Sequence, residues 1–224
     1  MKKTASTNSS VRKLKKELAT SEFRVSIFGS ARLKMEAKEY KMIYSLAKML
    51  GQRGIDIING GGPGLMEAAS KGHKSAGKKR KNSHVIGLNI KLPIEQKFNP
   101  DLDIKKTFTR FSGRLDAFMS LSNAFIVAPG GVGTLLEMLY AWQLMQVNQT
   151  CNVPIILLGD MWPGFVKWVE KEQLKRKLIS ERDLNLLFLA KNCKEAVKMI
   201  DTAYREFKSG NKNYCINYKK YKLY

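Results

Sequence analysis

The stretch "FIVAPGGVGTLLEML", Phe125–Leu139, decides the fold. It begins as an apolar run, passes through three glycines within four residues and continues with helical spacing. A strand, a glycine turn and a helix in that order form the repeating unit of a parallel α/β sheet. The same turn can cradle a phosphate, because glycine lets an anion approach the backbone amides at the start of a helix.

The strand-and-helix pattern repeats along the chain. We expect strands at 23–30, 55–60, 84–90, 104–109, 124–129, 153–159 and 186–190, and helices within 36–54, 61–77, 110–122, 134–147, 163–177 and 193–207. Strands that are apolar throughout are buried on both faces. The expected fold class is therefore α/β, with a single Rossmann-like, doubly wound domain over residues 21–208. Its mainly parallel sheet carries helices on both faces, and residues 1–20 and 209–224 are expected to be basic tails.

The formal charge of +21 on 224 residues raises the question of a polyanionic partner. The basic residues are mainly lysines, many of them near the two ends of the chain, and no zinc finger or RNA-binding signature accompanies them. This distribution favours a solvated surface over a nucleic-acid partner. No run of about 18 apolar residues is present, so we expect no membrane span.

The cysteines and the N-terminus indicate a cytoplasmic location. Cys151, Cys193 and Cys215 are far apart and form no C-x-x-C pair, so we expect neither a disulfide framework nor a cysteine zinc site. The N-terminus lacks the apolar segment of a secretory signal. We also expect no metal site, because the histidines are only two: His73 is expected to be solvated and His84 to be structural.

Three strand-to-helix turns are the places where a ligand would bind, because ligands of such sheets lie beyond the carboxyl ends of the strands. They are "FGSAR" (28–32), "NGGGPGLMEA" (59–68) and "PGGVGTLLE" (129–137). Leu136 occupies the third glycine position of a dinucleotide fingerprint, and neither a P-loop nor a G-x-S-x-G elbow is present. A mononucleotide or a sugar phosphate remains as the ligand class.

These motifs carry a resemblance to a known family. "PGGVGTLLE" resembles the P-G-G-x-G-T-x-x-E motif of the Lonely Guy (LOG) family, and "GGGPGLMEAA" resembles that family's earlier glycine motif. "GLNIKLPIEQ" and "LISERDL" are similar to its longer bacterial branch. The resemblance spans about residues 23–207. It implies hydrolysis of the N-glycosidic bond of a nucleoside 5′-monophosphate, a cytokinin nucleotide or AMP, without metal or organic cofactor, by a homodimer or larger homo-oligomer.

The resemblance also implies residue roles. Arg114 and Glu137 would be catalytic, and Glu95 would contact the substrate. Phosphate-binding residues would be Ser30, Gly130, Gly131, Gly133 and Thr134. The chain departs from the family at two positions. Leu115 stands where the family has lysine, and Gln143 stands where it often has threonine.

Simpler readings of the same residues stay open at this point. Thr134 and Glu137 have the spacing of a helix-capping box. Arg114 alone would more often form a surface ion pair, and Glu95 alone would be solvated. A nucleotide-binding or phosphorylated-cofactor carrier could use the same cradle without turnover.

Overall fold

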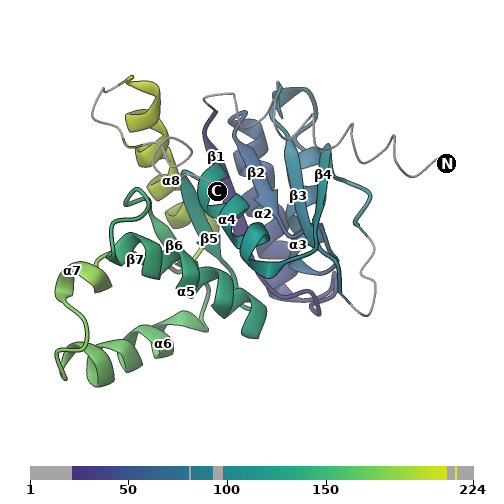
Figure 1. Ribbon diagram of the computed structural model, residues 1–224. Helices are drawn as coiled ribbons and strands as arrows, with labels where there is room; N and C mark the ends of the chain where they lie inside the picture. The colour runs from purple at the N-terminus through teal and green to yellow at the C-terminus, as the bar shows by residue number, and fades with distance from the viewer. Residues whose placement is uncertain (1–21, 81, 93–97, 211–214, 216–224) are drawn as a thin grey trace.

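The computed structural model describes residues 22–80, 82–92, 98–210 and 215, and its core is one sheet of seven strands (Figure 1). Every neighbouring pair of strands is parallel, and the order across the sheet is β4-β3-β2-β1-β5-β6-β7. The strands are β1 Arg24–Phe28, β2 Asp56–Asn59, β3 Val85–Ile90, β4 Ile104–Phe108, β5 Ala124–Val127, β6 Ile155–Leu158 and β7 Leu187–Ala190. All seven expected strands are thus confirmed.

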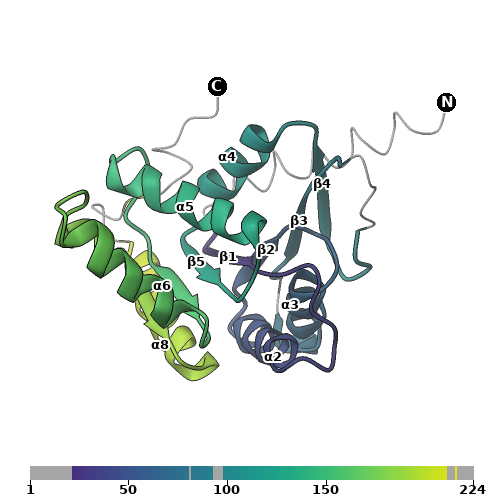
Figure 2. The ribbon, with the colours of Figure 1, turned by 90° about the horizontal axis from the view of Figure 1, so that it is seen from below.

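Helices cover both faces of the sheet, as expected for a doubly wound domain (Figure 2). Helices α2 (Lys38–Gln52), α3 (Leu65–Lys74) and α8 (Cys193–Lys208) pack on one face, and α4 (Phe111–Leu121), α5 (Val132–Gln146) and α6 (Trp162–Trp168) on the other. The inner strands β1, β2, β3, β5 and β6 are buried at every position. Burial on both faces explains why these segments are apolar throughout rather than alternating.

The strand order changes direction between β1 and β5. Strands β1 to β4 step towards one side of the sheet, and β5 returns to pair with β1, with Phe28 opposite Val127. The two turns that follow these strands therefore lead to opposite faces and leave a crevice between them. Ligands of doubly wound sheets bind at this switch point.

Two local features differ from the sequence-based expectation. The expected helix at 163–177 is α6 followed by a π-helical segment, Val169–Leu174. The short helix α7, Glu181–Leu184, was not expected; a capping box joins the side chains and amides of Ser180 and Asp183 and starts it. The expected tail 1–20 lies outside the described residues, and of 209–224 only 209, 210 and 215 are described.

The expectation that His73 is solvated is wrong. Its side chain in α3 is fully buried, and its Nε2 lies 2.8 Å from the carbonyl oxygen of Ile55. Burial lowers the pKa of His73 to about 4, because the charged imidazolium loses its hydration there. His73 thus belongs to the neutral packed core beneath the amino end of β2.

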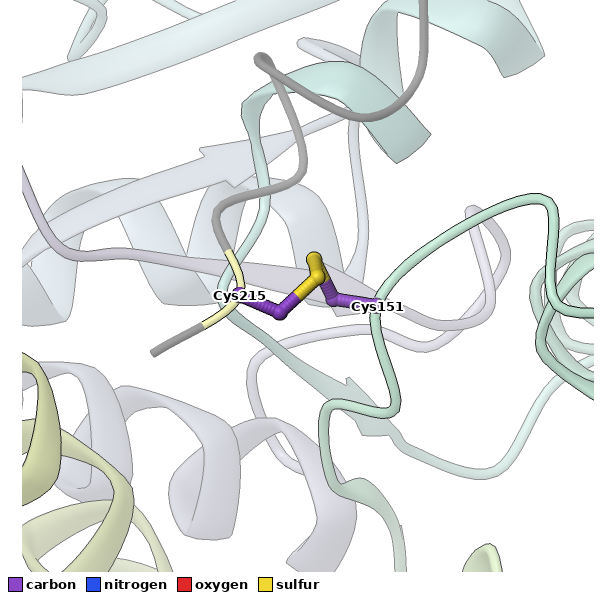
Figure 3. The surroundings of a disulfide bond; sticks show 2 residues. All are labelled: Cys151 and Cys215. Atoms are coloured by element: carbon purple, nitrogen blue, oxygen red, sulfur yellow. A yellow bond between two sulfur atoms is a disulfide. The ribbon is translucent and has the colours of Figure 1, made fainter. Parts of the chain in front are cut away.

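The expectation of a chain without a disulfide is also wrong. Cys151, in the segment before β6, is bonded to Cys215 beyond the end of α8 (Figure 3). The two residues are 64 positions apart. The cysteines meet because the parallel crossovers return both segments to the amino edge of the sheet. Their spacing along the sequence gave no sign of this. Cys193, in α8, is a free thiol.

Among the described residues, no helix combines the length and the apolar character needed to cross a bilayer.

Reduction of the disulfide should destabilise the fold. A bridge that closes a loop of 64 residues restricts the unfolded chain and so stabilises the folded state by roughly 4 kcal/mol. Dithiothreitol should therefore lower the Tm by on the order of 10 °C, measured by circular dichroism. Cys215→Ser should melt at the reduced temperature with or without reductant, and Cys193→Ser should respond like the wild type. An identical wild-type Tm under both conditions would contradict the bridge.

Candidate active site

A pocket of about 500 Å³ opens at the switch point of the sheet. This volume suits a small-molecule ligand. Its walls come from the ends of β1, β2 and β3, from the first turns of α4 and α5, and from α3. The lining residues are 29–32, 60, 66, 89, 90, 92, 111, 114, 131–134 and 137. The pocket thus contains most of the residues that the sequence singled out.

Arg114 and Glu137 form an ion pair inside this pocket. Arg114 Nη1 lies 3.0 Å from Glu137 Oε1, and the two side chains are 13% and 10% exposed. Arg114 projects from α4, and its Nε donates a hydrogen bond of 2.7 Å to the carbonyl of Leu88 in β3. Its guanidinium also lies over the ring of Phe118. Three contacts therefore fix the arginine, and the reading of Arg114 as a surface ion-pair partner is wrong.

Burial changes the acidity of Glu137. Loss of hydration raises its pKa to about 7, although the charge and the hydrogen bond of Arg114 pull the pKa down. A carboxyl group with a pKa near neutrality can exchange protons with a ligand at physiological pH. An ordinary surface glutamate could not do so, because it is fully ionised there.

The capping-box reading of Thr134 and Glu137 is wrong as well. Helix α5 begins at Val132, with Gly131 as its N-cap, and no side chain caps it. Thr134 is therefore already the third helical residue, and Glu137 lies in the second turn. The carboxylate reaches across to α4 instead of back to its own helix start.

The first glycine turn, 130–133, leaves open space beside the start of α5. A Cβ on Gly130 would collide with the side chain of Thr134, so packing requires glycine there. A Cβ on Gly131 or Gly133 would meet nothing within 4 Å. The free space lies at the pocket wall, where the first amides of α5 have no intrahelical partner. Such a helix start attracts anions, and a phosphate fits this geometry.

The second glycine turn, 60–64, serves the packing of the protein itself. Gly61 and Gly64 have φ angles of +72° and +69°, a conformation that favours glycine. A Cβ on Gly64 would lie 2.5 Å from the carbonyl oxygen of Ser30, and one on Gly60 would lie 2.5 Å from Arg114 Nη2. Within this turn, Gly60 gives Arg114 the room to reach Glu137.

The remaining residues considered in the sequence differ in where they lie relative to the pocket. Ser30 lines the pocket, and its Oγ accepts a hydrogen bond from the amide of Arg32 at 3.1 Å. Glu95 lies outside the described residues. Leu115 is buried, and Gln143 lies on the exposed side of α5; neither lines the pocket, so both departures from the family pattern fall outside its described wall.

Sequence reasoning missed several lining residues. Arg32, Met66, Asn89 and Phe111 all border the pocket. Arg32 stood in the "FGSAR" turn and Met66 in the second glycine motif, so both were within reach of the motif analysis. Asn89 and Phe111 could not be found in this way, because neither belongs to a motif. In the sequence, Asn89 looks like an ordinary strand residue and Phe111 like an ordinary helix residue.

A group of possible metal ligands lies at the opposite, amino edge of the sheet. Glu22, Asp56 and His84 place one ligand atom each within 4.8 Å of the others. Arg24 is buried beside them, with its Nε 3.6 Å from Asp56 and its Nη2 3.8 Å from Glu22. This cation pairs with both carboxylates, so we assign the group to an ion-pair network rather than to a metal site.

The chain is similar to several known proteins. The family model described as "Possible lysine decarboxylase" matches residues 66–200. A pyrimidine/purine nucleotide 5′-monophosphate nucleosidase of Escherichia coli (strain K12) is 33% identical over 126 residues, which are 54% of this chain and 28% of the relative. The chain therefore spans less than a third of the length of that enzyme.

Two further proteins resemble the chain over most of its length. The cytokinin riboside 5′-monophosphate phosphoribohydrolase LOG of Oryza sativa subsp. japonica is 24% identical over 192 residues, covering 84% of this chain and 76% of the relative. The molybdenum cofactor binding protein of Rippkaea orientalis has a similar structure, with a TM-score of 0.59, 22% identity, and coverage of 82% of this chain and 98% of that one. The structural likeness concerns the fold alone.

Removal of the arginine should raise the pKa of Glu137 further. The cation is the main group that lowers this pKa against the effect of burial, so in Arg114→Met the titration should move above the value of about 7. The pKa can be measured from the ¹³C shift of the labelled carboxyl group. Arg110→Met, which changes the N-cap of the same helix, should leave it unchanged. A Glu137 that titrates alike in both variants would show that the pair is not electrostatically coupled.

Proposed function

We propose that this chain, which belongs to the LOG-type family whose model is described as "Possible lysine decarboxylase", hydrolyses the N-glycosidic bond of a nucleoside 5′-monophosphate. The products would be a free base and ribose 5-phosphate. The observation that carries the proposal is the buried Arg114–Glu137 pair beside an open glycine cradle. The names of the nucleosidase and phosphoribohydrolase relatives support the same reaction class.

The pocket supports glycoside chemistry better than the decarboxylation named in the family description. An amine-forming decarboxylase that uses a Schiff base needs a lysine in its site. The described lining residues include the cations Arg32 and Arg114 but no lysine. Arginine does not form such an adduct; it binds phosphates and carboxylates through its rigid donor fork.

The chemistry follows from the two side chains. Breaking the bond between C1′ and the base builds positive charge on the ribose. The Glu137 carboxylate can stabilise that charge or take a proton from the attacking water. Arg114 would hold the carboxylate and a sugar or phosphate oxygen in place. Glu137 and Glu95 are the two candidates for protonating the departing base.

We also propose that the active form is a homodimer built on α5. Apolar side chains on the outer side of this helix, Val132, Leu136, Leu139 and Val147, are exposed, and Val132 is 84% exposed. Their spacing places them on one stripe, while Met138, Ala141 and Met145 bury the opposite side. The exposed side of α5 is therefore mainly apolar, although it includes Gln143, and a second copy of the chain can cover it.

The dimer can be tested by sedimentation velocity. The wild type should sediment as a dimer at micromolar concentration, and Leu136→Glu should dissociate it, because the stripe cannot bury an unpaired carboxylate. Leu178→Glu makes the same change at a residue that is exposed outside α5 and should leave the dimer intact. A monomeric wild type would exclude the interface.

The cytoplasmic location stays a prediction. The Cys151–Cys215 bond bears on it, because stable disulfides are rare in reducing compartments. The thiol state of the protein isolated from cells under alkylating conditions tests the location directly: both cysteines should be reduced if it is cytoplasmic.

The reaction itself is tested by base release from AMP. The wild type should release adenine, and Glu137→Gln should lower the rate by a factor on the order of a hundred or more, because an amide can neither take a proton nor balance a ribosyl cation. The variant should still bind AMP, and its Tm should fall, because the buried Arg114 loses its counter-charge. AMP that the wild type binds but returns intact would identify a carrier, and wild-type rates in Glu137→Gln would exclude the carboxylate mechanism.

A further inference from the structure

The pocket has two chemically different ends. Ser30 and Arg32 follow β1, and Gly131–Thr134 follow β5, so backbone amides, a hydroxyl group and a cation gather beside the switch point. At the other end, Ile90 and Leu92 come from the end of β3, and Phe111 begins α4. This second end presents aliphatic and aromatic surface.

The fold sets the distance between the ends. β2 separates β1 from β3, so the two ends are about 10 Å apart, or two strand spacings. The Arg114–Glu137 pair lies between them, because Arg114 contacts Leu88 of β3 on one side and Gly60, which follows β2, on the other. A ligand that spans the pocket therefore meets the phosphate cradle, the charged pair and the apolar end in that order.

We propose that the nucleotide lies across this edge of the sheet in one direction, with its phosphate between Arg32 and the 131–134 turn and its base against Phe111. The inference rests on the proposed function, since it orients the substrate of that reaction. In this direction the ribose, and with it the bond to be broken, falls beside Glu137. The reverse direction would place the charged phosphate against the side chains of Ile90, Leu92 and Phe111, and none of these described lining side chains carries a charge.

Phe111 is the side chain best suited to contact the base. Its ring is 50% exposed although it lines the pocket, so part of its surface is free to cover a ligand. It precedes Arg114 by three residues, which places both on the same side of α4. A base stacked on this ring would therefore be attached to a ribose close to the charged pair.

Stacking on Phe111 would by itself discriminate only weakly among bases. Stacking is tolerant because every base has an aromatic face. Strong discrimination requires hydrogen bonds to the edge of the base. Asn89 is the described polar side chain at this end, and its Oδ1 already accepts the amide of Ile90 at 2.8 Å. Phe111 would thus serve affinity and orientation more than choice of base.

The proposal is tested by comparing AMP with ribose 5-phosphate, which has the same phosphate and sugar but no base. Binding is measured by calorimetry in the Glu137→Gln background, so that turnover does not consume the ligand. Phe111→Ala should weaken AMP binding by roughly five-fold to a hundred-fold, which is the range for loss of a stacked base. Its affinity for ribose 5-phosphate should stay within about two-fold, the scatter expected for contacts that are not changed. Arg32→Ala should lower the affinity for AMP and for ribose 5-phosphate by similar factors.

Controls separate stacking from a general effect on the fold. Phe111→Tyr keeps the ring and should retain AMP affinity, whereas Phe111→Leu should not. Trp168→Ala removes an aromatic side chain of matched exposure, 51% against 50%, outside the pocket and should change neither affinity. Equal loss of both ligands in Phe111→Ala, or no loss of either, would overturn the orientation. The result does not depend on base release, so the orientation and the reaction can fail separately.

Discussion

The ion pair between Arg114 and Glu137 is the interaction on which the pocket depends. Either charge alone in this buried position would cost several kcal/mol, so each requires the other. The pair also requires specific neighbours. Leu88 of β3 supplies a carbonyl acceptor, and Gly60 leaves space that any side chain would fill. One contact thereby couples α4, α5 and the ends of two strands. Burial raises the pKa of the Glu137 carboxyl group to about 7, and Arg114 keeps that pKa from rising further.

The two glycine turns illustrate how similar sequences serve different physical needs. In the turn at 60–64, positive φ angles and close contacts explain the glycines through the protein's own packing. In the turn at 130–133, a Cβ on Gly131 or Gly133 would meet none of the described residues within 4 Å, so the space beside them is open there. This open space at the start of α5 faces the pocket, where a phosphate could approach the free amides.

The two edges of the sheet hold different kinds of features. The amino edge holds the Cys151–Cys215 bridge, the buried His73 and the Arg24 ion-pair network. The carboxyl edge holds the pocket and its charged pair. Leu115 and Gln143, the two departures from the family pattern, both lie outside the pocket wall that the structure describes.

The sequence by itself determined the alternation of strands and helices, the α/β class and the two residues of the charged pair. It could do so because strand burial and glycine turns are local patterns, and because the family motif ties Arg114 to Glu137 at a fixed separation. Only the tertiary structure decided that His73 is buried, that Cys151 meets Cys215, and that Phe111 borders the pocket. Each of these depends on segments that are distant in the chain. Such contacts are set by how parallel crossovers return across the sheet, and no local pattern of residues encodes that return.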